Sequence, residues 1–333
     1  MVKKKILFIC GSLNQTSMMH QISRYLSGHE CFFTPYYADG FINFVVQLGY
    51  LNFSILNGTF RKNTEKYLHD NRLKIDYRGL KADYDMVYTC ADLIYPKNIR
   101  NKKVILVQEG MTDPENLMFY LVKYFRIPRW IASTSAMGMS YRYNYFCVAS
   151  EGYKEFFIKR KAVPPEKLIV TGIPNFDNVK QYLNNNFPHK NFVLVCTSDS
   201  RETFKLENRI KFIKECVKIA NGKQLIFKLH PNENFERASG EINKYAPGAL
   251  VFTNGNTNEM IANCDVLVTK YSSVSFVGLA LGKEVHSYFN IDELKKLLPW
   301  QNDGTSAERI AQVGTELLEA EYTSEEKLSV GTA

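Results

Sequence analysis

The chain of 333 residues is long enough for two domains of ordinary size. Its hydrophobic content of 45% and charged content of 23% exclude a mainly disordered protein. The formal net charge of +8 favours an anionic partner, such as a nucleotide, a phospholipid surface or a polyanionic glycan. No block is basic enough to require nucleic acid, and no nucleic-acid-binding motif is present, so we expect no nucleic-acid partner.

The cysteines and the N-terminus predict a cytoplasmic protein. The seven cysteines include no CxxC pair, and several lie in apolar runs, which favours reduced core residues over disulfides or a zinc site. The apolar run after MVKKK is about six residues long, which is typical of a first strand and too short for a secretion signal. No run of ~18 apolar residues occurs, so no membrane-spanning segment is expected.

The first half of the chain predicts one α/β domain over residues 1–183. Short apolar runs predict strands at 6–10, 30–36, 85–90, 103–108, 145–149 and 168–171. Apolar spacing and turn residues predict helices at 15–26, 41–56, 61–71 and 151–159, with another beginning near Pro114. The strand–turn–helix opening resembles a Rossmann-like half, but the GxGxxG fingerprint of dinucleotide binding is missing.

The second half repeats this alternation over residues 192–305, after a linker at 184–191. Strands are predicted at 192–196, 224–229, 250–253, 266–269 and 284–288, and helices at 206–220, 235–245, 257–263 and 273–281. A C-terminal segment, 306–333, is predicted as a helix at 308–319 and a frayed tail from residue 322. The alternation predicts parallel sheets with right-handed crossovers. We therefore expect two Rossmann-like domains that face a central cleft.

Polar residues follow two strands of the second half in a way that suits phosphate binding. They are Lys228, His230 and Pro231 after one strand, and Lys270, Ser272 and Ser273 after another. In open α/β sheets, ligands collect outside the carboxyl ends of the strands. An isolated His-Pro pair is more typical of a capping histidine, but hydroxyls and free N–H groups at a helix start form an anion nest. Together they favour a donor-phosphate site.

Further polar residues of this half are candidate donor ligands. Thr197 and Ser198 follow the first strand of the half, although ordinary turn chemistry explains them nearly as well. Glu259 is a candidate ligand for a ribose diol, the alternative being a solvated helix residue. No paired carboxylates stand at a strand end, so no metal and no other cofactor is expected.

In the first half, Glu109 and Gly110 follow directly after a predicted strand. A carboxylate that is partly removed from water has a raised pKa and can act as a general base on a hydroxyl. The turn at Gly11 and Ser12 is assigned to the same acceptor side. His20, on the first predicted helix, is the competing base, but its apolar neighbours favour a packed histidine.

Residues 117–142 mix aromatic and basic side chains, among them Tyr120, Lys123, Trp130 and Arg142. Such a mixture can lie on an anionic membrane interface, which would place the protein at the inner face of the membrane. An aromatic acceptor-binding loop or ordinary core explains the composition equally well.

These motifs resemble those of the GT-B glycosyltransferases of bacterial surface-polysaccharide synthesis. The likeness is to the sialyltransferases and Kdo transferases that use CMP-activated sugars, and to the CDP-glycerol glycerophosphotransferases. Gln108-Glu109-Gly110 would match the acidic-acidic-Gly motif of these enzymes, although Gln108 departs from it. His230-Pro231 and Ser272-Ser273 would match their His-Pro and paired Ser/Thr motifs. The resemblance implies that Glu109 is the base and that His230 and the serines bind the donor phosphate.

The resulting hypothesis is an inverting, metal-independent transferase. It would move a sugar or a polyol phosphate from a nucleotide-activated donor, with CMP or CDP as the carrier, to a hydroxyl of a glycan or lipid-linked acceptor. One alternative is an enzyme that resembles UDP-GlcNAc 2-epimerase, which shares the two-domain fold. Another is a catalytically silent protein that binds nucleotide sugars.

Overall fold

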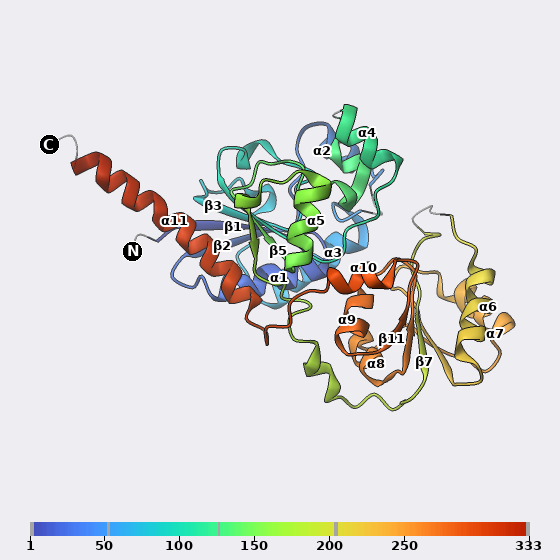
Figure 1. Ribbon diagram of the computed structural model, residues 1–333. Coiled ribbons are helices and arrows are strands. Elements are labelled where there is room, and N and C mark those ends of the chain that lie inside the picture. The colour runs from blue at the N-terminus through green and yellow to red at the C-terminus, as the bar shows by residue number, and fades with distance from the viewer. Residues whose placement is uncertain (1–2, 52–53, 126, 203–205, 331–333) are drawn as a thin grey trace. The chain divides into compact units, whose positions relative to one another are not determined.

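The computed structural model describes residues 3–51, 54–125, 127–202 and 206–330, and only the backbone of 321–330. The chain divides into two compact units. The N-terminal unit consists of Met1–Asp177 together with Asn302–Ala333. The inserted unit is Asn178–Gln301. Each unit contains one parallel sheet, so the predicted architecture of two α/β units with parallel strands is confirmed (Figure 1).

The described part of the N-terminal unit is built on a six-stranded sheet in the order β2-β1-β3-β4-β5-β6. Its strands are β1 Lys5–Ile9, β2 Glu30–Thr34, β3 Met86–Thr89, β4 Lys103–Val107, β5 Tyr145–Val148 and β6 Leu168–Val170. Its helices are α1 Leu13–Arg24, α2 Gly40–Gln47, α3 Gly58–Asp70, α4 Leu117–Phe125, α5 Glu151–Lys161 and α11 Ser306–Val330. Because the strands are parallel, their carboxyl ends and the loops that follow them lie along one edge of the sheet.

An aromatic stack fixes the centre of this sheet. Phe8 pairs in register with Phe33 on β2 and with Tyr88 on β3, and its ring lies 5.1 Å and 5.0 Å from theirs. All three side chains are buried. Helix α11 passes close to Tyr88, since a Cβ at Gly314 would lie 1.9 Å from the tyrosine hydroxyl. A glycine at this position therefore lets the last helix pack on the first sheet.

Two predicted helices differ from the observed ones. The helix predicted at 41–56 ends at Gln47, because the chain turns at Gly49 with a φ of 81°, which favours glycine. The last helix was predicted to end at residue 319 and to be followed by a frayed tail, but α11 continues to Val330. Residues 320–330 contain neither glycine nor proline, so no helix breaker occurs before Gly331.

The described part of the inserted unit is built on a five-stranded sheet in the order β11-β10-β7-β8-β9. Its strands are β7 Val193–Cys196, β8 Leu225–Lys228, β9 Leu250–Phe252, β10 Val266–Val268 and β11 Glu284–His286. Its helices are α6 Arg209–Ala220, α7 Phe235–Tyr245, α8 Thr257–Asn263, α9 Val274–Ala280 and α10 Ile291–Lys296. Strand order reverses between β7 and β10, which makes this pair the switch point where such sheets bind ligands.

The C-terminal helix belongs to the first sheet and not to the second. The chain leaves the N-terminal unit after Asp177 and returns to it at Asn302. There the Asn302 N–H donates to the Asp177 carbonyl at 2.9 Å, and the Ser306 N–H donates to the Asp177 carboxylate at 2.9 Å. Helix α11 then packs against α1 and β4. The chain thus leaves the N-terminal unit and returns to it at two neighbouring points, Asp177 and Asn302, and the inserted unit lies between them in the sequence.

Within the part of the chain that the structure describes, no helix is both long enough and apolar enough to cross a membrane.

Candidate active site

Glu109 follows β4 and is held by Ser12, from the turn after β1, and by Gln15 of α1. The Ser12 hydroxyl donates to one carboxylate oxygen at 3.0 Å, and the Gln15 amide donates to the other at 2.6 Å. Ser12 also caps α1 by accepting a hydrogen bond from the Gln15 N–H at 3.2 Å. Because Ser12 and Gln15 belong to the ordered start of a helix, they fix the direction of the Glu109 carboxylate.

Burial raises the pKa of the Glu109 carboxyl, although the hydrogen bonds from Gln15 and Ser12 oppose this shift. Gly11 makes the arrangement possible, since a Cβ there would lie 2.4 Å from the Gln15 side-chain oxygen. Burial raises the pKa values of Tyr37 and Cys90, and the nearby Glu109 carboxylate raises them further. Glu109 is therefore a carboxylate in a weakly hydrated site, held by neutral donors, as a general base requires.

Gln108 has a structural role beside Glu109. Its side chain is buried, and it accepts the Ala149 N–H at 3.0 Å while donating to the Gly110 carbonyl at 2.8 Å. The amide thus connects the ends of β4 and β5. An acid at this position would have no donor for the Gly110 carbonyl and would bury a charge. This explains why the first position of the motif is glutamine in this chain.

His20 lies apart from the group around Glu109. Its ring nitrogen Nδ1 is 3.1 Å from the Tyr67 hydroxyl of α3, and its ring packs edge-on against Phe33. Burial lowers the pKa of His20. The structure places His20 in the packing between α1 and α3, which agrees with the packed histidine that its apolar neighbours favour.

In the inserted unit, the loops after β7, β8 and β10 meet around the switch point. The Thr269 hydroxyl donates to the Cys196 carbonyl at 3.1 Å, which joins the ends of β10 and β7. The His230 N–H donates to the Thr197 hydroxyl at 3.1 Å, which joins the ends of β8 and β7. The predicted donor residues of these loops therefore share one sheet edge.

The His230 ring is oriented by two residues of these loops. Its Nδ1 accepts the Asn232 N–H at 3.3 Å, and the Asp199 carboxylate lies 3.7 Å from the same nitrogen. The Asn232 amide also donates to Asp199 at 3.0 Å. The ring is half-exposed. With Nδ1 used as an acceptor, the proton of the neutral ring is on Nε2, from which it can be donated to a ligand.

A buried ionic network stabilises this edge. Arg209, with 3% of its side chain exposed, contacts the carboxylates of Glu207 and Glu233, each 1% exposed. Glu207 also accepts from Lys270 at 2.7 Å. Glu233 accepts from the Thr197 hydroxyl and, at 2.9 Å, from the His230 N–H. The network ties the three strand ends together and pairs each buried charge.

Other predicted donor residues have local partners. The buried Lys228 ammonium donates to the carbonyls of Leu229 and Thr253 at 3.2 Å and 2.7 Å, and burial lowers its pKa. It thereby joins the ends of β8 and β9. The Glu259 carboxylate accepts from the Asn256 amide at 3.0 Å, at the start of α8. Both contacts are structural, so the structure gives no support to a role in donor binding.

The remaining predicted donor residues lie at the edge with few internal contacts. The hydroxyl of Ser272 accepts the Val274 N–H at 3.4 Å, while Ser273 precedes α9 without a side-chain cap. Pro231 is exposed, and Ser198 shares a hydrogen bond of 2.9 Å with Ser200. Helix α9 has seven residues, so its dipole adds little, and the hydroxyls themselves are the groups available to a ligand.

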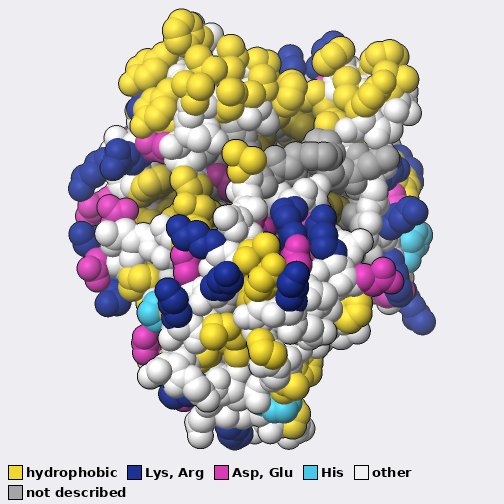
Figure 2. Space-filling view, turned by 90° about the vertical axis from the view of Figure 1, so that its right-hand side faces the viewer, with side chains coloured by type: hydrophobic (Ala, Val, Ile, Leu, Met, Phe, Trp, Pro, Cys, Tyr) yellow, Lys and Arg dark blue, Asp and Glu magenta, His cyan; other side chains and the backbone are white. Residues whose placement is uncertain are grey.

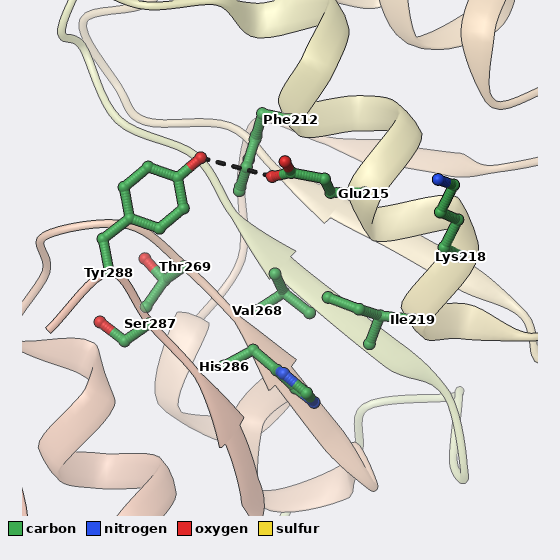
Figure 3. A pocket seen from close by; sticks show the side chains of 9 residues that line it. All are labelled: Phe212, Glu215, Lys218, Ile219, Val268, Thr269, His286, Ser287 and Tyr288. Carbon is green, nitrogen blue, oxygen red and sulfur yellow. Dashed lines mark hydrogen bonds between the residues drawn. The ribbon is translucent and has the colours of Figure 1, made fainter. Parts of the chain in front are cut away.

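A cavity of about 350 Å³ lies beside the switch point, between α6 and the ends of β10 and β11. Phe212, Ile219 and Tyr288 supply apolar walls, and the Tyr288 hydroxyl donates to Glu215 at 3.4 Å (Figure 3). None of the predicted donor residues lines the cavity. Among the described residues, no group of three or more His, Cys, Asp or Glu side chains is arranged to hold a metal ion.

The family model for CDP-glycerol:poly(glycerophosphate) glycerophosphotransferase matches residues 60–288, which is more than half of the chain. The chain belongs to this family. It is therefore a transferase of the GT-B type that uses a nucleotide-activated donor in the synthesis of a cell-surface polymer. The matched segment contains Glu109, His230 and both serines, and it ends at Tyr288, after the last strand of the second sheet.

Solved structures share the fold of this family member. A variant of the wall teichoic acid polymerase TagF is 13% identical, with a TM-score of 0.53, and the match covers 96% of this chain and 90% of that chain. The UDP-GlcNAc 2-epimerase of Neisseria meningitidis is also 13% identical, with a TM-score of 0.59 and coverage of 94% and 100%. At this identity the likeness concerns the fold alone. No curated protein matches in sequence.

The sequence motifs of this glycerophosphotransferase family member do not reveal the residues that hold the predicted site together. Gln15, Glu207, Arg209 and Glu233 were not assigned a role. Glu233 could have been found from the sequence, since it lies three residues after the predicted donor residue His230. Each of the other three residues has a partner that is distant in the sequence. Gln15 and Glu109, for example, are 94 positions apart.

Proposed function

We propose that this chain transfers a polyol phosphate, with CDP-glycerol as the first candidate donor, to a hydroxyl of a glycan or lipid-linked acceptor. A CMP-linked sugar is the other donor that the resemblance implies. The observation that carries the proposal is the Glu109 carboxylate, which is held by Ser12 and Gln15 and has a raised pKa. Glu109 lies within the segment that matches the family model.

The reaction is one in-line displacement that inverts the attacked centre. The acceptor hydroxyl gives its proton to Glu109 while its oxygen forms a bond to the outer phosphorus of CDP-glycerol. The bond between that phosphorus and the bridging oxygen breaks, and CMP leaves with the electron pair. The raised pKa makes Glu109 a stronger base than an ordinary carboxylate, provided that the pH is high enough to keep it ionised.

The switch-point edge of the inserted unit is assigned to the donor. His230 has Nε2 available to donate to a phosphate oxygen, and Ser272 and Ser273 supply hydroxyls. Hydrogen bonds to a phosphate oxygen strengthen as the leaving group gains charge. Because the protein itself supplies these donors, the proposal includes transfer without a metal ion.

The proposal places the enzyme in the cytoplasm at the inner face of the membrane. It includes peripheral contact of residues 117–142 with the lipid surface, where a lipid-linked acceptor would be found. The basic and aromatic composition of this segment supports the contact.

Two measurements on the full chain test the donor and the reaction. In a thermal-shift screen, CDP and CMP are expected to raise the melting temperature more than UDP and UMP, because ligands that bind the folded state stabilise it according to their affinity. CMP release from CDP-glycerol is expected to require an acceptor and to continue in EDTA. Preference for uridine nucleotides would refute the cytidine donor. Turnover of a UDP-sugar without an acceptor would indicate an epimerase.

A further inference from the structure

Two short helices of the N-terminal unit expose an unusual number of large hydrophobic side chains. On and just after α2, four are 55–72% exposed: Phe41, Phe44, Leu48 and Tyr50. On α4, five are 38–74% exposed: Leu117, Met118, Tyr120, Tyr124 and Phe125. Figure 2 shows hydrophobic side chains gathered at the end of the N-terminal unit where Figure 1 places α2 and α4. Exposed apolar patches of this kind mark sites of interaction.

Helix α4 is firmly attached on its inner side. Phe119 and Val122 are buried in a cluster with Ala132 and Ala136 of the 3₁₀ segment Arg129–Ala136. The Lys161 ammonium of α5 lies 3.6 Å from the centre of the Phe119 ring and 3.2 Å from the Glu115 carboxylate. The outward residues are therefore exposed on a helix whose other face is packed.

Helix α2 is attached by polar contacts just before its first residue and at its middle. The Asp39 carboxylate, just before the helix, accepts the Lys97 N–H at 2.7 Å. The Tyr36 hydroxyl donates to the Asn43 side chain at 2.6 Å. Val46 is the buried residue of this helix. Ile42 and Val45 are partly buried, whereas Phe41 and Phe44 are exposed.

The charged side chains within these two segments are all basic. Residues 40–60 contain no charged side chain, and residues 117–142 contain four basic residues and no acidic one. Lys123 donates to the Arg160 carbonyl, and Arg129 donates to the Asp92 carbonyl and also interacts with the buried Asp92 carboxylate. The acids that flank the two segments, Asp39 and Glu115, are hydrogen-bonded within the unit. This combination complements a negatively charged surface with an apolar interior.

We propose that α2, α4 and the segment Arg129–Ala136 form one surface that inserts into the interface of an anionic phospholipid bilayer. Phenylalanine and leucine side chains would enter the acyl boundary, while tyrosine, Trp130 and the basic residues would lie among the headgroups. The inference rests on the membrane contact included in the proposed function and extends it to α2. It requires no part of the transfer chemistry.

A second copy of the chain is a less suitable occupant of this surface. In a two-fold symmetric dimer the same patch meets itself, so that the basic residues of 117–142 would face those of the other copy with no acid between them. Like charges at an interface oppose association. Anionic lipid removes this repulsion and accepts the apolar side chains as well.

Flotation of the full chain with vesicles tests the proposal. Binding is expected with vesicles of phosphatidylglycerol and phosphatidylcholine in equal parts, and much less with phosphatidylcholine alone. The double variants Phe41→Ser/Phe44→Ser and Leu117→Ser/Phe125→Ser are each expected to weaken binding by on the order of tenfold, because each removes two inserted side chains. Phe235→Ser is the matched control, since this phenylalanine of the inserted unit is 52% exposed and should not affect binding.

Tryptophan fluorescence reports insertion independently of activity. The chain has two tryptophans, and Trp300→Phe leaves Trp130, which is 45% exposed, as the only one. Its emission is expected to shift to the blue with anionic vesicles, and brominated lipid is expected to quench it. Three outcomes would overturn the proposal. They are no flotation of the wild type, vesicle binding by the α2 and α4 variants that equals that of the wild type, or dimerisation through the patch that abolishes vesicle binding. Loss of transfer with intact flotation would refute the proposed chemistry only.

Discussion

The carboxyl edges of the two sheets carry opposite kinds of chemistry. At the edge of the N-terminal unit, Glu109 is bound by the neutral donors Ser12 and Gln15, and burial raises its pKa. At the edge of the inserted unit, the buried acids Glu207 and Glu233 are paired with Arg209 and bonded to neighbouring loops. One carboxylate lies among neutral donors, and the other two lie beside a buried guanidinium.

This difference shows how one fold can supply two functions. Burial raises the pKa of a carboxylate that has no cation beside it, and such a group is suited to take a proton. Carboxylates that pair with a buried guanidinium keep their charge and hold loops in place. Four predictions can break or sharpen the comparison.

The largest effect is expected for Glu109→Gln. The amide keeps the size of the side chain but cannot accept the acceptor proton, so turnover should fall by on the order of 10²–10⁴-fold while donor affinity is retained. CMP release and calorimetric titration with CDP measure the two quantities. Glu166→Gln, at an exposed position of the same unit, is the control and should be active. A variant that loses donor binding instead of turnover would show that Glu109 serves the donor.

Arg209→Met tests the role of the buried network. It leaves Glu207 and Glu233 without their shared cation, which should lower the free energy of unfolding of the inserted unit by about 3–5 kcal/mol. Denaturant unfolding measures the change. Arg237→Met is the control, because Arg237 pairs with Glu202 at a more exposed position and should cost no more than about 1 kcal/mol. Equal losses of unfolding free energy in the two variants would mean that the buried network stabilises this edge no more than an exposed ion pair does.

His230→Ala addresses the predicted donor contact. Loss of a hydrogen bond to a charged phosphate should weaken CDP binding by roughly 1.5–3 kcal/mol, which corresponds to about 10- to 150-fold. Titration calorimetry gives the dissociation constant. Lys228→Met should leave that constant unchanged, since its ammonium bonds to two backbone carbonyls. If Lys228→Met weakens CDP binding and His230→Ala does not, the assignment of the donor site is wrong.

The smallest effect is a change in pH dependence for Gln15→Leu. The Gln15 amide favours the ionised form of Glu109, so its removal should raise the pKa of Glu109 further. The base works above its pKa, and the acidic limb of the kcat/KM profile should therefore move to higher pH. Gln21→Leu, on the same helix, is the control. A profile that stays in place would show that Gln15 does not tune the base.

The sequence predicts the alternation of strands and helices well, because buried parallel strands appear as short apolar runs between helical segments. Helix α8 begins and ends at its predicted residues, Thr257 and Asn263. The stretch at 41–56 was misread as one helix. Its apolar residues recur at helical spacing, but the structure leaves Phe41, Phe44, Leu48 and Tyr50 exposed, and periodicity does not say whether an apolar face is covered.

The site was predicted in part. A polar residue after a strand can be located from sequence, which is why Glu109 and His230 were found. The partner of such a residue depends on which loops the topology brings together. Gln15 reaches Glu109 from helix α1, and Arg209 reaches Glu233 across 24 positions. Whether a lysine serves a ligand or the backbone, as with Lys228, likewise depends on neighbouring carbonyls that a sequence does not show.

The return of the chain at Asn302 has a consequence for the order of folding during synthesis. Helix α11 packs on α1 and β4, yet the ribosome makes it after the whole inserted unit. Domains fold as units while the chain grows, so the inserted unit can complete its sheet while the N-terminal sheet still lacks one covering helix. The N-terminal unit, whose synthesis begins first, is therefore completed last.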